Sequence, residues 1–459
     1  MPGQLVQSTF QFGEISPLML ARADSQIYYR ALRKARNVLV IPQGGVTVRF
    51  GTEYIDDLSN HTTDYTELKP FIFDYEDGAR YVLLFRENAI DVYYNDSVVA
   101  TLTTTYAASE ISSLSIAQSQ NLVFVAHGSH APAIIRRTSA HAGWSIDTSP
   151  RVVAYPTYDF RDDYESLTFQ IQISATPITT AQNLLGQVVD IVSGSGTPFS
   201  ADHVGGLFFA EGGTIRITGY TSGTTVTGRI IDTFDTVSAL FHGANNITGE
   251  DAVITEKAWS TNRGQPEKVG FFQNRIFFGK TASLPGGLWG SNYNGFKFDA
   301  LKFDDSENLA TNAISTTLQG KKSVIIRDIT GYKTIVVLTS SGIFTSSSLD
   351  QSALTPQTIQ FLNQQTADGS DDLEAVIFDN SLIFFDKGGR KVRDLVLREA
   401  TGNYATRNIS VLSPHLIDSP YSAAIFENSS EEDGSWLFMV NAGTSELPDG
   451  TSLEGPQRS

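Results

Sequence analysis

Cysteine is absent from this chain of 459 residues. This absence excludes disulfides, thiolate metal centres and thiol nucleophiles, so stability must come from packing or assembly. Long apolar runs are missing as well, and none approaches the ~20 residues needed to cross a bilayer. The opening MPGQLVQSTF also lacks the basic segment and apolar core of a secretory signal. The sequence therefore predicts no membrane insertion.

Positive charge is scarce, because 33 lysines and arginines face 50 aspartates and glutamates, for a net charge of −17. A protein that grips DNA normally carries the opposite sign, since basic side chains must replace the counterions on phosphates. Acidity of this size has two interpretations. It keeps a protein soluble, or it repels nucleic acid that passes close to the surface. Composition does not choose between them.

Helical periodicity is scarce in the sequence. The best candidate covers residues 21–33, where Ile27 and Ala31 share one face at helical spacing and Asp24 or Ser25 could cap the start. Its basic end contains Arg30 and Arg33. We expect a short helical segment here and β-structure almost everywhere else.

Apolar strands separated by tight polar turns recur along the chain. The expected central strands begin near Tyr81, Leu122, Ile276, Thr334, Leu382 and Trp436. The turns between strands are expected at Asp77-Gly78, Gln120-Asn121, Gln273-Asn274, Asp379-Asn380 and Asp433-Gly434, which suit hairpins with positive φ. Except across one long gap, neighbouring central strands lie roughly 40 to 60 residues apart, the range of propeller blades. Continuous apolar strands fit blades that bury both faces.

The long gap between Leu122 and Ile276 predicts an insertion. Residues 164–259 alternate polar and apolar positions between glycine-rich turns, which indicates a compact antiparallel domain. The predicted fold is therefore all-β: a β-propeller-like platform with an inserted small antiparallel β-domain and a short N-terminal helical segment. The expected divisions are an N-terminal arm, helix and hairpin (1–60), first blades (61–155), inserted domain (156–260), and remaining blades with the C-terminal tail (261–459).

A marked hairpin is expected early in the chain, in NVLVIPQGGVTVRFGTEYI, residues 37–55. Two β-branched runs flank Pro42-Gln43-Gly44-Gly45, and the two glycines permit backbone angles that side chains disfavour. In a propeller this hairpin would precede or complete the ring.

Motifs that carry chemistry are mostly excluded on inspection. NRIFFGKT (274–281) imitates a phosphate-binding loop, but Asn274 stands where that loop needs glycine, and a bulky strand follows. His127 and His130, with His141 nearby, could share a metal, but no third ligand or carboxylate has suitable spacing. ADGSDDLE (367–374) resembles a calcium loop, but Leu373 and Asp379 occupy the positions that need glycine and glutamate.

Enzymatic signatures are equally weak. No serine nucleophile elbow occurs, and the adjacent acids Asp304-Asp305 and Asp162-Asp163 are common chance features of a β-protein, although paired carboxylates can serve glycoside hydrolysis. The residues thus predict a non-enzymatic β-rich protein with no catalytic, cofactor-binding or metal-binding residues.

Three ordered blocks resemble the tail tubular protein B, or tail nozzle (hub), family of short-tailed bacteriophages. The first contains Gly13-Glu14-Ile15-Ser16-Pro17, Arg22-Ala23-Asp24, Asn37, Pro42-Gln43-Gly44-Gly45 and Arg49-Phe50-Gly51-Thr52. The others are FSADHVGGLFFAEGGTIRITGY (199–220) and WSTNRGQPEKVGFFQNRIFFGKTASLPGGLWGSNYNGFKFD (259–299). Many members are longer, which puts receptor-facing roles of this chain in doubt.

The resemblance implies a virion structural protein of the phage tail. It implies a ring, commonly a hexamer, below the portal and adaptor proteins, with tail fibres as further partners and a channel through which DNA leaves without specific binding. The extended N-terminal segment is expected to contact a neighbouring subunit or the adaptor, or else to pack on its own domain. The interface candidates are Phe10, Phe12, Glu14, Pro17, Arg22, Asp24, Arg30 and Arg33.

Two other functions stay open from sequence. Propellers often carry sugar sites, so the chain could be a carbohydrate-binding or sugar-cleaving tail protein, with Trp144, Trp289 and Tyr293 stacking on sugars if they are exposed. It could also be a free propeller that binds cellular proteins.

Overall fold

The computed structural model describes most of the chain. The described residues are 7, 9–20, 22, 24–57, 67–75, 78–138, 140–173, 176–177, 185–210, 212–234, 247–306, 309–345, 353–378, 381–398, 402–426, 435–441, 445–446 and 452–453. Their structure is almost entirely β, and the helices among them are short 3-10 turns. No helix in this part of the chain is long and apolar enough to span a membrane.

Five antiparallel sheets of four strands each form the main body of the protein. In each sheet the strands pair in chain order, and one central strand of each, β5, β8, β22, β28 or β32, is almost completely buried. The first two sheets are β3 (Lys69–Asp74), β4 (Arg80–Arg86), β5 (Ala89–Tyr94) and β6 (Ser97–Thr103), then β7 (Ser115–Ser119), β8 (Leu122–His127), β9 (His130–Arg137) and β10 (Trp144–Asp147). The third is β21 (Lys268–Phe272), β22 (Arg275–Gly279), β23 (Gly287–Gly290) and β26 (Ile314–Thr317). The fourth and fifth are β27 (Ile326–Gly331), β28 (Ile335–Thr339), β29 (Gly342–Thr345) and β30 (Asn363–Thr366), then β31 (Val376–Phe378), β32 (Ser381–Phe385), β33 (Val392–Arg398) and β34 (Asn403–Asn408).

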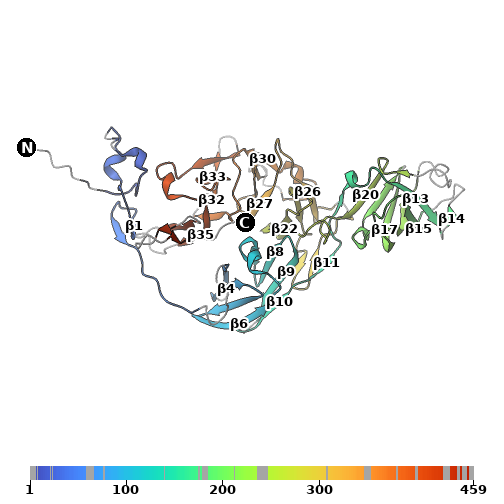
Figure 1. Ribbon diagram of the computed structural model, residues 1–459, viewed down its shortest axis with the longest axis horizontal. Coiled ribbons are helices and arrows are strands. Elements are labelled where there is room, and N and C mark those ends of the chain that lie inside the picture. Colours follow the sequence, from blue (N-terminus) through green and yellow to red (C-terminus); the bar gives the residue numbers. More distant parts are fainter. Residues whose placement is uncertain are drawn as a thin grey trace, which may run out of the picture.

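These sheets are arranged like the blades of a propeller. The first strands of successive sheets contact one another, β7 with β21 and β21 with β27, while the fourth strands meet at β6 with β10 and β30 with β34. Figure 1 shows the sheets following one another in an arc from blue to red, although strand pairing does not close the arc into a ring. The predicted all-β, propeller-like fold is confirmed.

Charged side chains join the sheets where their first strands meet. Lys69 at the start of the first sheet lies 3.0 Å from Glu374, which precedes the fifth sheet. Asp372 pairs with Lys268 of the third sheet at 3.4 Å and with Arg327 of the fourth. Asp372 therefore links three sheets, and its pKa is lowered because these two cations outweigh the effect of burial.

Within the described part of the chain, a sixth sheet is formed by β35 (Pro420–Phe426) and β36 (Trp436–Asn441). The expected N-terminal hairpin is present as β1 (Val38–Val40) and β2 (Val46–Val48), with Gly44 at φ +90°. Phe50, just after β2, has its ring centroid 5.5 Å from that of Phe426 and 6.0 Å from that of Trp436. The hairpin therefore lies beside the sixth sheet, as Figure 1 also shows.

The insertion is a nine-stranded antiparallel sheet in the order β12-β20-β16-β17-β18-β15-β13-β14, with β19 pairing to β13. Its strands are β12 (Thr157–Asp159), β13 (Thr168–Ile173), β14 (Thr176–Pro177), β15 (Val188–Ser193), β16 (Leu207–Ala210), β17 (Gly213–Ser222), β18 (Thr225–Asp232), β19 (Ile247–Thr248) and β20 (Ala252–Lys257). Alternate residues of these strands face a core of their own, which includes Phe169, Phe208 and Ile215. The expected inserted antiparallel domain is thus present, at the right of Figure 1.

The remaining elements are smaller. A three-stranded sheet has the order β11-β25-β24, from Arg151–Val153, Ala300–Lys302 and Phe296–Lys297, and β37 (Ser445–Glu446) pairs with β38 (Ser452–Leu453). The 3-10 helices are η1 (Pro17–Met19), η2 (Tyr28–Arg30), η4 (Ala108–Ser113), η5 (Arg161–Asp163), η6 (Ala201–His203), η7 (Ile359–Phe361) and η8 (Pro414–Leu416).

The N-terminal helical segment is shorter than helical periodicity predicted. Within residues 21–33, of which 21 and 23 lie outside the described residues, the helix is confined to η2. Leu32 accounts for this, because its amide donates to the carbonyl of Gly13 at 2.7 Å and its carbonyl accepts from Ile15 at 3.1 Å. Leu32 is thereby held in a parallel bridge with Glu14, and Ala31 before it has extended backbone angles.

Each expected turn that is described in whole or in part contains at least one residue with positive φ. Gly78 is at φ +79°, Gln120 at +53°, Gln273 at +47° and Asn274 at +58°. The expected turns at Asp379-Asn380 and Asp433-Gly434 lie outside the described residues.

Candidate functional site

The predicted N-terminal interface segment packs partly on its own chain. The amide of Phe10 donates to the carbonyl of Gly44 at 2.7 Å, and that of Phe12 to the carbonyl of Arg30 at 3.3 Å. The carboxylate of Glu14 accepts from the amide of Ala35 at 2.6 Å and lies 3.1 Å from Nε2 of His415. Glu14 is therefore occupied by its own chain, close to the start of the sixth sheet.

The remaining interface candidates lie at the surface. Arg22 and Asp24 form an exposed ion pair with nitrogen and oxygen 2.8 Å apart, and Pro17, Arg30 and Arg33 are exposed. Their role in contacting a neighbouring subunit or adaptor stays a prediction.

Sequence reasoning did not identify the apolar surface beside this segment. The exposed fraction is 75% for Val48 on β2 and 61% for Val440 on β36. The other members are Phe50, Phe426 and Phe438, all at least 42% exposed. We call these five residues the apolar face. Phe50 contacts Phe426 and Trp436, which joins the end of the hairpin to the sixth sheet. Grouped exposed apolar residues mark interaction surfaces.

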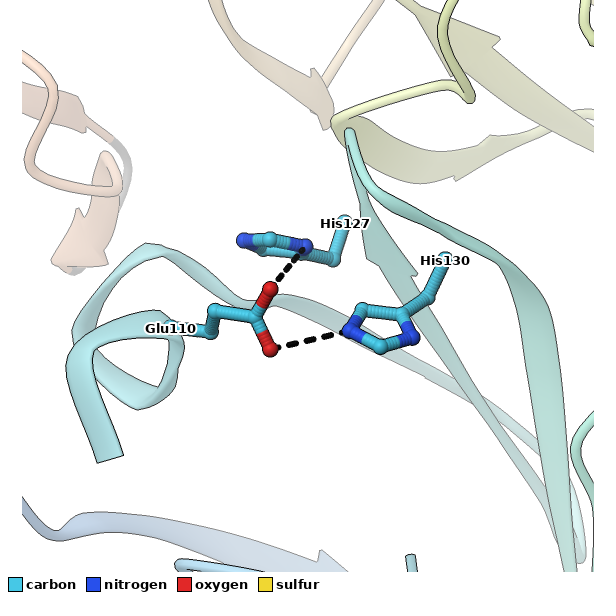
Figure 2. Close-up of side chains that lie close together, drawn as sticks. All are labelled: Glu110, His127 and His130. Atoms are coloured by element: carbon cyan, nitrogen blue, oxygen red, sulfur yellow. Dashed lines mark hydrogen bonds and ion pairs between the residues drawn. The ribbon is translucent and has the colours of Figure 1, made fainter. Parts of the chain in front are cut away.

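A second grouping is a cluster of Glu110, His127 and His130. Glu110 lies on η4, between the first and second sheets, while the two histidines flank the turn between β8 and β9. Figure 2 shows both imidazoles directed at the Glu110 carboxylate. His130 Nε2 lies 2.9 Å from Oε2, and His127 Nδ1 lies 3.9 Å from Oε1. Within the described part of the chain, no other group of three histidine, aspartate or glutamate side chains has metal-ligand spacing.

The electrostatics of this cluster follow from partial burial. Burial lowers the pKa of His127, and Glu110 opposes this shift. Burial acts to raise the pKa of Glu110, but the amide of Ala107 and the neighbouring imidazoles outweigh it, so that pKa is lowered. Glu110 is thus an anion and His127 is biased to its neutral form.

Sequence spacing missed the carboxylate of this cluster. The expectation that no carboxylate lies among the histidines was wrong. Glu110 precedes His127 by 17 residues in the sequence, but η4 places its side chain beside both imidazoles. His141 is not part of the cluster: its Nδ1 lies 2.5 Å from the hydroxyl of Tyr81, and its ring stacks on that of Tyr94.

The segments that resemble a phosphate-binding loop (274–281) and a calcium loop (367–374) have structural roles. NRIFFGKT contains the buried strand β22. The guanidinium of Arg275 donates to the carbonyls of Ser291, Asn312 and Ala310 at 2.5, 2.7 and 2.6 Å. In ADGSDDLE, Asp372 pairs with Lys268 and Arg327, and Asp368 pairs with Arg393 at 3.1 Å.

One acid of each adjacent pair considered for glycoside hydrolysis forms an ion pair with a basic side chain. Asp163 pairs with Arg263 at 2.6 Å, and Asp304 lies 3.4 Å from Lys302. Of the three aromatic residues considered for sugar stacking, Trp289 is buried, and Trp144 packs edge-on against Phe73. Tyr293 alone of these three is exposed, so the arrangement offers no stacking platform built from this set.

Comparisons with known proteins give no family. No family model matches the chain, and no curated protein matches it. Among solved structures, it is similar to an inactive variant of virginiamycin B lyase from Staphylococcus aureus, with 11% identity and a TM-score of 0.31 over 82% of this chain and 93% of that one. It is also similar to an auxiliary nutrient-binding protein from Bacteroides ovatus, with 10% identity and a TM-score of 0.25 over 63% and 86% of the two chains. A third neighbour is BBS1N in complex with ARL6DN, with 11% identity and a TM-score of 0.30 over 81% and 88%. TM-scores and identities this low carry nothing about function to this chain.

Proposed function

We propose that this chain is a virion structural protein that forms a ring in the tail nozzle, or hub, of a short-tailed bacteriophage. The ring, with six subunits as the expected number, lies below the portal and adaptor proteins and provides a channel for DNA ejection. The three sequence blocks that resemble the tail nozzle family support this function.

The structural observation that supports it most is the apolar face. Val48 and Val440 expose most of their surface, and the other three members of the apolar face are phenylalanines, residues that are enriched at the buried centre of subunit interfaces. Strand β36 has one neighbour, β35, among the described strands. An edge of this kind can pair with a second chain or be covered by one.

The charge of the chain suits a conduit. A net charge of −17 repels the phosphates of passing DNA, so the wall would guide DNA without holding it. We therefore expect no retention of duplex DNA by the purified protein at physiological salt, measured by gel shift.

Charged substitutions in the apolar face test the assembly. Val48→Asp and Val440→Asp each place a charge in the proposed interface, and we expect each to reduce the ring fraction at micromolar concentration by about tenfold or more. Mass photometry measures the distribution. The matched control is Val188→Asp, a half-exposed valine on the inserted domain, which should leave the ring unchanged.

The N-terminal segment is tested separately. Removal of residues 1–20 deletes Phe10, Phe12, Glu14 and Pro17, and we expect the ring to be lost or weakened. An unchanged ring would show that this segment packs only on its own chain. Rings that survive both valine variants would exclude the apolar face as the subunit interface.

A further inference from the structure

We propose that Glu110, His127 and His130 form a binding site for one divalent transition-metal ion of the zinc class. The three ligand atoms come from three elements, η4, β8 and β9, and lie within 4.8 Å of one another. Nothing in the proposed assembly requires this site, so the inference stands independently of the proposed function.

The separations between ligand atoms suit a small ion. Bonds of about 2.1 Å in a tetrahedral zinc site place neighbouring ligand atoms ~3.4 Å apart. Oε2 of Glu110 lies 2.9 Å from Nε2 of His130, and its other oxygen, Oε1, lies 3.9 Å from Nδ1 of His127, so the two separations fall on either side of that value. The three side chains are only 13–25% exposed, so the space between them is partly shielded from water.

Ser113 fixes the protonation of His127 in the form that binds metal. The Ser113 hydroxyl donates to the carbonyl of Glu110 at 2.8 Å, so its oxygen is free to accept from Nε2 of His127, 3.1 Å away. With its proton on Nε2, His127 presents the lone pair of Nδ1. Support of the other ring nitrogen by a hydrogen-bond acceptor is the usual second contact of a metal-binding histidine.

No donor hydrogen lies between Nδ1 of His127 and Oε1 of Glu110 when the proton of His127 is on Nε2. With its proton on Nε2, Nδ1 of His127 is an acceptor, and a bound ion would replace the hydrogen bond that Nδ1 accepts from the amide of Ser129 at 3.3 Å. Oε1 of an ionised carboxylate is also an acceptor. Two acceptors that face each other at 3.9 Å are too distant for a hydrogen bond. A cation between them would interact favourably with both.

His130 completes the set after its proton moves from Nε2 to Nδ1. Two imidazole nitrogens and one carboxylate oxygen select zinc, or a similar transition ion, over magnesium and calcium, which prefer oxygen ligands. Water would occupy the fourth position, because three side chains supply three ligand atoms. The ion would join η4, in the connection between the first and second sheets, to the β8–β9 turn.

Equilibrium dialysis against ZnCl₂ tests the site directly. The full chain is used without a polyhistidine tag, since a tag would bind the ion, and bound metal is measured by mass spectrometry. We expect one zinc per chain that MgCl₂ in large excess does not displace. His130→Ala and His127→Ala should each weaken zinc affinity by about 100-fold or more, and Ser113→Ala by about tenfold, as expected for a residue that positions a ligand.

His141→Gln is the matched control, since this histidine lies nearby but outside the cluster, and it should retain one zinc per chain. Circular dichroism in EDTA checks that every variant is folded before dialysis. Zinc should also raise the melting temperature of the wild type and of His141→Gln, but not of His130→Ala. The proposal is overturned by wild-type protein that binds no zinc, or by folded His127 and His130 variants whose affinity equals that of the control.

Discussion

At the scale of single residues, buried charges hold irregular backbone in place. The side chain of Arg275 is buried, burial lowers its pKa, and its guanidinium occupies three carbonyl oxygens that no strand ladder satisfies. We expect Arg275→Met to lower the free energy of unfolding by about 3 kcal/mol or more, because the three acceptors lose their donor. Urea unfolding followed by tryptophan fluorescence measures this, since Trp259 and Trp289 are buried in the third-sheet core.

Arg80→Met provides the control for that experiment. Arg80 is an exposed partner of Asp74, and its loss should change the free energy of unfolding by no more than about 0.5 kcal/mol. Equal effects of the two substitutions would contradict the role assigned to Arg275.

His203 makes the inserted domain sensitive to pH. Its Nδ1 accepts from the amide of Ser200 at 3.1 Å, and Nε2 lies 3.1 Å from the hydroxyl of Tyr164, which itself donates to Glu256. Burial lowers the pKa of His203 from its ordinary value of 6.5, while Glu256 and Asp202 oppose the shift and Arg263 adds to it. Because the folded-state pKa is lowered, the stability contributed by His203 is present above pH 6.5 and is lost as pH falls from there through the folded-state value.

Thermal melts between pH about 7 and about 5.5 test this linkage. The wild type should lose at most about 1.4 kcal/mol per pH unit through this group. His203→Gln should be less stable at about pH 7 but should show a smaller loss as the pH falls. An identical pH slope in both proteins would show that His203 does not carry the effect.

At the scale of elements, glycines permit close contact between the first strands of neighbouring sheets. A Cβ on Gly270 of β21 would lie 2.1 Å from the carbonyl oxygen of Ile329 on β27, and a Cβ on Gly331 would lie 2.2 Å from that of Phe271. We expect Gly270→Ala to destabilise the protein by about 1–3 kcal/mol through overpacking, seen as a lower melting temperature. Gly51→Ala is the control: a Cβ at Gly51 would meet no atom within 4 Å, so this substitution should leave the melting temperature unchanged.

Much of the element order could be predicted from sequence, because strand periodicity and turn chemistry are local. A strand begins at or next to each of the six expected positions, and the first five are central strands of their sheets, but β36 at Trp436 has one neighbour among the described strands. The N-terminal helix was overestimated, since Leu32 pairs with chain near Gly13 that helical periodicity does not register. The two-stranded form of the sixth sheet was not predicted either, because pairing across a sheet is non-local.

The candidate sites were harder to predict for the same reason. The two histidines could be found from their spacing, but Glu110 joins them only through the fold of η4. The apolar face was missed because Val48 and Val440 each fit an ordinary strand, and only their exposure distinguishes them. No local pattern reports which face of a strand lacks a covering layer.

At the scale of the whole molecule, a propeller-like body, an apolar face at its open end and a strongly acidic composition are consistent with one unit of an axial ring. The face lies where the N-terminal hairpin meets the sixth sheet, which has two strands among the described residues, so a neighbouring subunit in the proposed ring would cover this face. This places the N-terminal segment, Glu14 included, next to the proposed subunit contact.

The most direct test of this account is negative-stain electron microscopy of the purified, full-length chain at micromolar concentration, with its mass determined by mass photometry. We predict closed rings with an axial opening and a mass of about six chains, the number that the family resemblance implies. A homogeneous population with the mass of one chain, 50.0 kDa, and no ring in any class average would contradict it.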